Sequence, residues 1–275
     1  MTGKWGKKMI YSVIVVGITI LYLMPLIWMV LNSFKADVEI FRSPPTFWPE
    51  NFTLSGYTDQ MKGGFWKYFK NSVLIATLST GVSLLLGIPA AYGLARFRAK
   101  GKRTIILGFL ITQMLPPALL LTPLYLLYSN IRLTNTLAAS ILSTATLSIP
   151  FMIIMLRPFF SSLPKALEDA ARTDGCNMLT AFVRIMLPVS KTGIFTAATF
   201  SFVFAWSDLI YSTSFIQNSD YWPLTTMIND YQTKYGTKWN SILAFGVCLM
   251  LPVLLLFFVT QKYVIMGMTT GAVKE

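Results

Sequence analysis

The sequence contains no histidine among its 275 residues and only two cysteines. The Ser-His and Cys-His pairs that activate a nucleophile therefore cannot form, and His-ligated metal sites are excluded. A phosphate-binding loop of the Gly-x-x-x-x-Gly-Lys-Ser/Thr type is also missing. Its nearest approach, Ala99-Lys100-Gly101-Lys102, lacks the upstream glycine and is followed by Arg103. We therefore expect no catalytic residue, cofactor site or metal site on this chain, so that any chemistry belongs to a partner.

Charge is scarce as well. Only 12% of the residues are charged, about half the fraction of a typical soluble domain, and 54% are hydrophobic, with a mean hydropathy of +0.59. Five long windows contain no charged residue, and a sixth contains only Asp208. Each window exceeds the roughly 20 residues that an α-helix needs to cross a membrane, and backbone groups in lipid must pair within their own segment. The sequence thus predicts an all-α, polytopic bundle with six membrane spans, at residues 9–34, 71–95, 104–131, 133–156, 192–219 and 239–261.

The basic residues predict the orientation of these spans. With six spans, the side that holds both termini carries 15 of the 23 basic residues, and the opposite side carries 8. The positive-inside rule then places both termini in the cytoplasm of a cell membrane, with the basic loop Arg96–Arg103 as the strongest anchor. The net charge of +12 is accordingly interpreted as a topology signal and as contact with anionic lipid, with no role in binding nucleic acid. On this topology Cys176 is cytoplasmic and Cys248 lies within the last span, so the two should not form a disulfide.

The predicted cytoplasmic segment 157–191 is too rich in helix-forming residues to be a plain linker. Glu168 and Arg172 stand at the favourable i,i+4 spacing for an ion pair, and Gly175 stands where a helix would end in the left-handed conformation. A second helical stretch, Met178–Met186, should stop before Pro188. Leu167, Ala170 and Ala171 share a small, mildly apolar face. The residues alone leave open whether this helical pair packs on its own protein or is presented to a partner.

At this segment the sequence resembles the cytoplasmic EAA loop of binding-protein-dependent ABC importer permeases. The family pattern Glu-Ala-Ala-x-x-x-Gly, followed after nine residues by Ile-x-Leu-Pro, is matched by Asp169, Ala170, Ala171, Gly175, Ile185, Leu187 and Pro188. The extension found in the sugar-importing branch is matched by Pro164, Leu167, Glu168 and Asp174. Asp169 departs from the family glutamate by one methylene, so it keeps the charge with a shorter reach.

Further matches follow in order along nearly the whole chain. They lie at Ser33–Phe41, Pro44-Pro45, Asn71-Ser72, Pro123–Tyr125, Leu133–Leu137, Pro150-Phe151, Trp206–Asp208, Gln261–Tyr263 and Gly267–Lys274. Together they make the chain similar to the permease subunits of maltose-permease-like sugar importers.

The resemblance implies a type I ABC importer permease fold and the transport of a sugar or oligosaccharide. It further implies four kinds of partner: a dimer of ATPase subunits that binds ATP and Mg²⁺, a second and unlike permease, an extracytoplasmic sugar-binding protein, and membrane lipid. The residues that would couple the permease to the ATPase are Leu167, Glu168, Asp169, Ala170, Ala171, Asp174, Gly175, Leu187 and Pro188.

Three residues of the predicted fifth span could lie on the translocation path. Asp208 is the only ionisable residue within a predicted span, and such residues tend to face a protein interior or a cavity. Phe202 and Trp206, four residues apart, could stack on a sugar ring. For all three, packing or a structural contact is the more ordinary interpretation. Pro116-Pro117 and Pro123 should break or kink the third span.

An ion-coupled secondary transporter is the main alternative function. Such a transporter would need more ionisable residues within the spans than this sequence has, and it often contains an inverted repeat, which we do not find. A membrane-embedded enzyme lacks the histidines and paired carboxylates it would use, and a passive scaffold gives the EAA-like loop no role.

Overall fold

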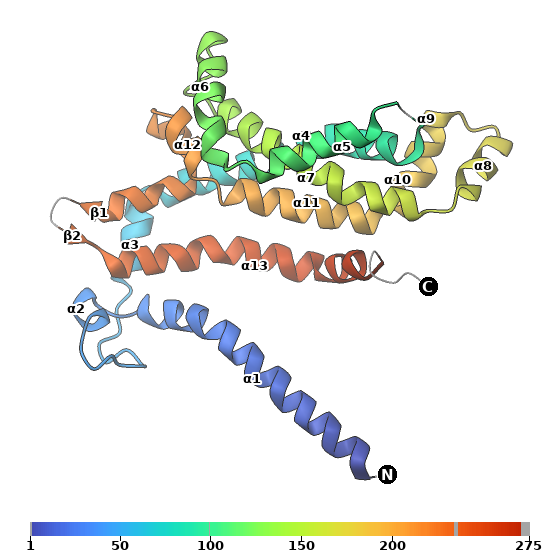
Figure 1. Cartoon of the computed structure of the whole chain (residues 1–275). Helices are drawn as coiled ribbons and strands as arrows, with labels where there is room; N and C mark the ends of the chain where they lie inside the picture. Colours follow the sequence, from blue (N-terminus) through green and yellow to red (C-terminus); the bar gives the residue numbers. More distant parts are fainter. Residues whose placement is uncertain (1, 99, 234–235, 271–275) are drawn as a thin grey trace. The chain divides into compact units, whose positions relative to one another are not determined.

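The computed structural model describes residues 2–98, 100–233 and 236–270, and these residues are largely helical (Figure 1). They form two compact units, which we describe separately. Unit 1 comprises residues 1–65 and 227–252, and unit 2 comprises residues 66–226 and 253–275. The long helix α13 (Trp239–Thr270) begins in unit 1 and ends in unit 2, and Pro252 is the last residue of its unit 1 part.

Unit 1 is built around two long apolar helices. Its elements are α1 (Thr2–Asn32), α2 (Asp37–Ile40), α3 (Ser55–Lys62), the end of η4 (Leu224–Tyr231), the hairpin strands β1 (Gln232–Thr233) and β2 (Gly236–Thr237), and the first part of α13. The two strands pair antiparallel, with Gln232 opposite Thr237. Along Tyr11–Asn32 the most apolar stretch of α1 buries none of its side chains within the chain, as expected of a helix that faces lipid.

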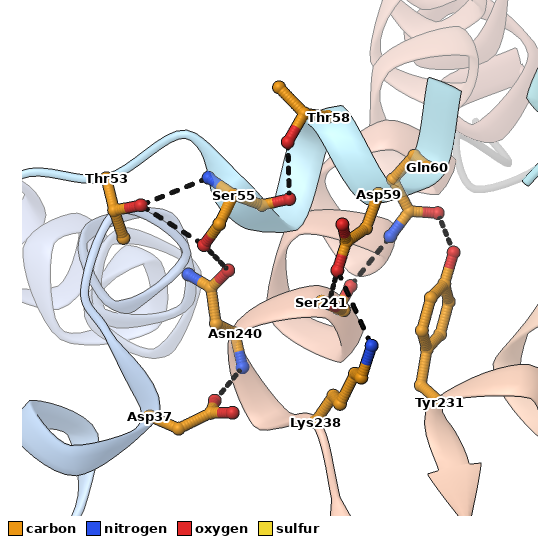
Figure 2. A network of polar contacts seen from close by, with 10 residues as sticks. All are labelled: Asp37, Thr53, Ser55, Thr58, Asp59, Gln60, Tyr231, Lys238, Asn240 and Ser241. Atoms are coloured by element: carbon orange, nitrogen blue, oxygen red, sulfur yellow. Dashed lines mark hydrogen bonds and ion pairs between the residues drawn. The ribbon is translucent and has the colours of Figure 1, made fainter. Parts of the chain in front are cut away.

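A polar network holds the segment that follows α1 to the start of α13, and Figure 2 shows the bonds of Asn240 to Asp37 and Ser55. The Asn240 side-chain amide donates to the carbonyl oxygens of Ser33 and Lys35, at 2.9 and 2.6 Å, and its oxygen accepts from the Ser55 hydroxyl at 3.1 Å. The Asn240 backbone N–H donates to Asp37 at 2.7 Å, which supplies an acceptor at the start of α13. One asparagine therefore joins α13 to the segment that leaves α1 and to α3.

The same network fixes α3 to the hairpin side of unit 1 (Figure 2). The Gln60 amide donates to the carbonyl of Ser241 at 2.8 Å and accepts from the Tyr231 hydroxyl. Asp59 forms an ion pair with Lys238 at 3.8 Å. Gln60 is fully buried, so its satisfied hydrogen bonds matter more than an exposed pair would.

The loop between α2 and α3 is organised by two buried charges. Lys35 is 1% exposed; its ammonium donates to the Thr46 carbonyl at 2.5 Å and lies 4.9 Å from the centre of the Trp28 ring. Glu39 accepts from the Glu50 backbone N–H at 2.8 Å and from the Thr46 hydroxyl at 2.9 Å. These hydrogen bonds, led by the one from Glu50, hold the pKa of Glu39 below its usual value against the opposing effect of burial.

Unit 2 contains the remaining elements. They are α4 (Phe65–Arg96), α5 (Lys102–Met114), η1 (Pro117–Leu120), α6 (Leu121–Asn130), α7 (Leu137–Ser162), α8 (Ala166–Thr173), α9 (Met178–Ala181), the π-helical turn η2 (Phe182–Met186), α10 (Leu187–Val189), α11 (Lys191–Trp206), α12 (Ile210–Phe215), η3 (Ser219–Tyr221) and the end of α13. Helix α7 packs against α5, α11 and α12 (Figure 1). The Thr136 hydroxyl caps its first turn by accepting from the Ala139 N–H.

Small and hydroxylated side chains let α7 approach its neighbours closely. A Cβ atom added at Gly193 of α11 would lie 2.7 Å from the Phe159 ring, and one at Gly87 of α4 would lie 2.9 Å from the Met152 sulfur. The Ser148 and Ser201 hydroxyls are 2.5 Å apart across the α7–α11 contact. Such small-residue contacts and interhelical hydrogen bonds are typical of helix pairs in membranes.

The described helices account for the six predicted spans only in part. Four are long and apolar enough to cross a membrane alone: α1, α4, α7 and α13. The third predicted span breaks, as expected, at Pro116-Pro117, where the halves Lys102–Met114 and Pro117–Asn130 are bent by 103°. Pro123 does not interrupt the helix, because it lies in the first turn of α6, where a proline is tolerated.

The prediction of one continuous helix over 192–219 was wrong. Helix α11 ends at Trp206 and α12 begins at Ile210, so Asp208 lies in the link between them instead of inside a helix. Together with the preceding segment Met178–Val189, α11 makes a second bent pair of helices, with a bend of 77°. The hydropathy of this window indicated apolarity correctly but not the interruption, since Ser207 and Asp208 favour turns and caps over helix interiors.

Two asparagines tie the segment after α12 to distant parts of unit 2. Asn135 adopts a positive φ of 63°; its side-chain oxygen accepts from the N–H groups of Gln217 (3.0 Å) and Asn218 (2.7 Å). The Asn71 amide on α4 donates to the carbonyls of Asp220 and Trp222, both at 2.9 Å. The segment after α12 is thereby fastened at two points by side chains from distant parts of the sequence.

Candidate functional site

The EAA-like segment folds as the helix α8 at one end of unit 2, beside α9 (Figure 1). Gly175 has a φ of +83° directly after this helix, as predicted. The Cys176 N–H bonds to the Ala171 carbonyl at 2.9 Å and the Gly175 N–H to the Arg172 carbonyl at 3.0 Å. This pair of bonds is the Schellman arrangement, which requires a residue in the left-handed conformation. Asn177 then caps α9, so the turn between the two helices is defined on both sides.

The two faces of α8 have different surroundings. Ala171 is 2% exposed and Leu167 is half-buried, so these residues attach the helix to the body of unit 2. Asp169, Ala170 and Asp174 are exposed. The small face expected from the sequence is therefore divided: Ala170 lies on the outside beside Asp169, and Ala171 lies on the inside.

Glu168 bonds to α4 and not to its helical neighbour. Its carboxylate lies 2.8 Å from the Arg96 Nε and accepts from the Tyr92 hydroxyl at 3.2 Å. The Arg96 and Glu168 side chains are only 6% and 16% exposed, and Arg96 also donates to the Leu163 carbonyl at 2.8 Å. Glu168 thus pairs with Arg96, 72 positions earlier, and not with Arg172 as predicted. The guanidinium of Arg96 is buried, so leaving it without an anion would cost more free energy than leaving the exposed Arg172 unpaired.

The helix after α8 differs from its prediction as well. It does not stop at Met186 but passes through the π-helical turn η2 and continues past Pro188 to Val189. A π turn loosens the helix before the proline, which otherwise would clash with the preceding turn. Met186 is fully buried and Leu187 half-buried, while Pro188 is exposed.

A hydrophobic cluster of unit 2 includes side chains of η2. Tyr92 is its central aromatic residue: its ring centre is 4.6 Å from that of Phe182 and 5.5 Å from that of Phe160. Leu163 and Met186 belong to the same cluster, so both ends of the 157–191 segment are embedded in it. Helix α8 itself packs on α9 and η2, and Phe182 and Met186 of η2 carry that contact into the cluster formed with α4, α7 and α11.

The three residues predicted for a translocation path have structural partners. Asp208 caps α12: its carboxylate accepts from the N–H groups of Tyr211 (3.2 Å) and Ser212 (3.0 Å), and from the Ser212 hydroxyl at 2.8 Å. Phe202 and Trp206 stack on one another, with ring centres 6.0 Å apart, and Trp206 is 3% exposed. In this conformation the Trp206 ring is covered by protein, and Asp208 has a clear role in starting a helix.

A cavity of about 340 Å³ next to these residues has an aromatic lining that sequence reasoning missed. It is lined by Gln113, Leu147, Ser148, Phe151, Phe200, Val203, Phe204 and Ser207. A second hollow, of about 290 Å³, shares Phe204 and Ser207 with the first and reaches Asp208. Gln113 donates to the Leu147 carbonyl at 3.1 Å, which leaves its amide oxygen as a further polar group of the cavity. Only the bend at Pro116-Pro117 hinted that residues near it would line a hollow.

Comparison with known proteins identifies the family. The profile described as "Binding-protein-dependent transport system inner membrane component" matches residues 83–269, which include α8, η2 and the cavity. This chain belongs to that family. The permease is therefore a multi-pass inner-membrane component, and the membrane bundle expected from its sequence is confirmed.

Named relatives align with the permease over almost its whole length. It is 30% identical over 91% of its residues to the diacetylchitobiose uptake system permease protein DasC of Streptomyces coelicolor, 91% of which is covered. It is 35% identical over 91% to the probable ABC transporter permease protein YurM of Bacillus subtilis (83% covered). With the sulfoquinovosyl glycerol transport system permease protein SmoH of Agrobacterium fabrum it shares 34% identity over 92% (89% covered).

Among solved structures, the permease matches a chain from the crystal structure of a bacterial ABC transporter involved in the import of the acidic polysaccharide alginate. The TM-score is 0.76 at 20% identity, and 96% of the permease and 98% of the other chain are covered. This likeness shows that the permease has the all-α fold of an ABC importer permease.

Proposed function

We propose that this permease carries a sugar or oligosaccharide across the cell membrane as one subunit of an ATP-driven importer. The observation that carries the proposal is the set of relatives, at 30% identity or more over nine-tenths of the chain, two of which are named for the uptake of a sugar derivative. The partners in this proposal are an ATPase dimer that binds ATP and Mg²⁺, a second permease and an extracytoplasmic binding protein. Both chain termini lie in the cytoplasm, on the side of the basic loop Arg96–Arg103.

In this proposal α8 is the element that couples the permease to the ATPase. Its exposed residues Asp169 and Ala170 form the docking face: alanine lets another surface approach closely, and the carboxylate offers an ion-pair partner. On the inner side, Glu168 connects the helix to α4, and the helix packs on α9 and η2. Movement of a docked ATPase would then reach the spans through one ion pair and one packed cluster.

The sugar path in this proposal runs along the two hollows between Gln113 and Asp208. Phe200 and Phe204 are 43% and 40% exposed, so their ring faces are free to stack on a sugar. The hydroxyls of Ser148 and Ser207 and the Gln113 amide would supply hydrogen bonds. Binding cavities commonly combine aromatic side chains that cover the ligand with a few polar groups that orient it. Asp208, Phe202 and Trp206 then support the wall of the path.

Substitution of Gly175 tests the coupling role. Nothing lies within 4 Å of a Cβ added there, so any effect comes from the φ of +83° and not from a clash. Asparagine tolerates this conformation and valine does not, at a cost of about 1–3 kcal/mol. We expect ATP hydrolysis per transported sugar in proteoliposomes to increase in the order wild type, Gly175→Asn, Gly175→Ala, Gly175→Val. Gly81→Ala, a helical position with the same open space, is the matched control.

Two outcomes would count against the proposal. Normal coupling in Gly175→Val would show that α8 does not transmit the ATPase movement. Uptake that continues without the ATPase subunits but collapses when the ion gradient is dissipated would favour the ion-coupled transporter instead.

A further inference from the structure

A cationic pocket opens between the first turns of α5 and the last turns of α7. Its volume is about 510 Å³, and it is lined by Lys102, Arg103, Ile106, Leu107 and Arg157. The lining thus combines three cations and two apolar side chains with no carboxylate. The four ion pairs among the described residues involve other basic residues, so none of these three cations has a carboxylate partner there.

Arg157 carries a buried donor that the described part of the chain does not satisfy. Its Nε is buried and has no hydrogen-bond acceptor among the described residues. Buried polar groups in native proteins are almost always bonded, and an orphaned donor on a cation is especially unfavourable. Because Arg157 lines the pocket, an anionic oxygen bound there would satisfy this donor after a shift of the side chain.

The start of α5 adds positive potential to the same pocket. Gly101, at the N-cap position with a φ of +79°, offers no side-chain acceptor to the first N–H groups of the helix. Unpaired N–H groups and the helix dipole both favour an anion at this end. Lys102 and Arg103 are the first two residues of this helix and line the pocket.

An apolar stripe leads away from the pocket along α5. Leu107, Leu110, Ile111 and Met114 follow one another at i, i+3, i+4 and i+7, and each is more than 40% exposed. From Arg103 to Met114 the helix rises about 16 Å, close to the thickness of one leaflet in a hydrocarbon core of about 30 Å. A polar head site continuous with an apolar track of this length fits a lipid better than a free phosphate ion.

We propose that this pocket binds the phosphate headgroup of an anionic phospholipid, with an acyl chain lying along the α5 stripe. Basic pockets of this kind at the cytoplasmic side of membrane helices are known to hold anionic headgroups. The site does not depend on which solute the permease moves. The proposed site differs from the general attraction of the basic loop to the membrane surface because it holds one lipid at a defined position.

The test uses the intact importer complex, purified and reconstituted in nanodiscs of phosphatidylcholine with or without phosphatidylglycerol. Native mass spectrometry would measure the phosphatidylglycerol that stays bound. Lys102→Gln/Arg103→Gln removes two pocket charges, and Arg98→Gln/Lys100→Gln removes two charges from the same loop outside the pocket. We expect retention to weaken about fivefold per pocket charge, so about 25-fold for the first double variant, and less than about twofold for the second.

Arg157 separates a headgroup site from general surface attraction. Arg157→Gln should weaken retention about fivefold or more. Arg157→Lys keeps the charge but loses the Nε donor, so it should recover only part of that loss, whereas diffuse attraction predicts full recovery. The readout is independent of sugar transport, so a failure here does not bear on the proposed function.

Three results would overturn the proposal. Equal losses in the two double variants would show only diffuse attraction to the membrane. Displacement of phosphatidylglycerol by inorganic phosphate alone would show a free-phosphate site without a role for the stripe. Cross-linking of a Leu110→Cys probe to the second permease, in place of a lipid probe, would show that protein covers the stripe.

Discussion

The ion pair between Glu168 and Arg96 holds the inner face of α8 to the end of α4, and its removal can be followed quantitatively. Loss of one member of a buried pair strands the other charge, which costs about 3–5 kcal/mol. Both side chains here are less than one-fifth exposed. The charge left behind keeps one hydrogen bond in either case, Arg96 to the Leu163 carbonyl or Glu168 from the Tyr92 hydroxyl, so the lower end applies. We expect Arg96→Met and Glu168→Met each to lower the unfolding free energy by about 3 kcal/mol.

The double variant should cost far less than the sum of the two single variants. With both charges replaced by methionine, no charge is stranded, and apolar replacements of buried pairs are often close to neutral. We expect a total loss of about 0–2 kcal/mol, hence a coupling energy of about 4–6 kcal/mol in the double-mutant cycle. The measurement is denaturation of the detergent-solubilised complex, with ATP hydrolysed per transported sugar recorded in parallel.

Arg172 provides the control because it is the partner that helical spacing alone suggests for Glu168. It is exposed, and Arg172→Met should change the stability by less than about 0.5 kcal/mol. Additive effects of Arg96→Met and Glu168→Met, to within about 0.5 kcal/mol, would refute the reasoning. A large loss of stability in Arg172→Met would instead support an ion pair between Glu168 and Arg172.

Three further perturbations test other parts of the structure. Gly193→Ala should destabilise the complex by about 1–3 kcal/mol in thermal denaturation, because its Cβ would meet the Phe159 ring at 2.7 Å; a neutral result would mean that α7 and α11 do not pack so closely. Asp208→Ala should cost about 1 kcal/mol by the same assay through loss of the α12 cap, and Asp208→Asn should cost less; equal costs would point to a need for the charge itself. Because the pKa of Glu39 is lowered on folding, its stabilisation should be present above the usual glutamate pKa and be lost as the pH falls through the lowered value; thermal scans across that range should show this loss in wild type and not in Glu39→Gln.

Much of the fold could be predicted because lipid imposes simple rules. Charge-free windows of sufficient length located four long helices and one of the two bent pairs, and Pro116-Pro117 identified the break in that pair. The interruption after Trp206 was missed, since apolar composition continues across it and only Ser207 and Asp208 mark the turn. Hydropathy therefore indicates which residues lie in the membrane but not whether the helix is continuous.

The candidate site was predictable where the determinants are local. The left-handed Gly175 follows from its place after a helical pattern, and the Schellman bonds confirm it. The partner of Glu168 could not be found in this way, because Arg96 lies 72 positions away and sequence spacing reveals only pairs within one helix. The cavity lining was missed for the same reason, since Gln113, Phe151 and Phe204 come from three helices.

Asn135 illustrates how an exposed position can be as constrained as a core residue. Its backbone φ of 63° is unfavourable for most residues, and only Gly, Asn and Asp adopt it at little cost. Its side-chain oxygen also accepts hydrogen bonds from two N–H groups, and glycine has no side chain to replace that acceptor. Its own N–H donates to the Phe215 carbonyl at 2.7 Å, so three hydrogen bonds depend on one residue at the surface. In a library of random substitutions selected for transport, this position should accept aspartate and little else. Designs that graft or lengthen the neighbouring loops should leave it unchanged, although solvent exposure alone would mark it as a free site.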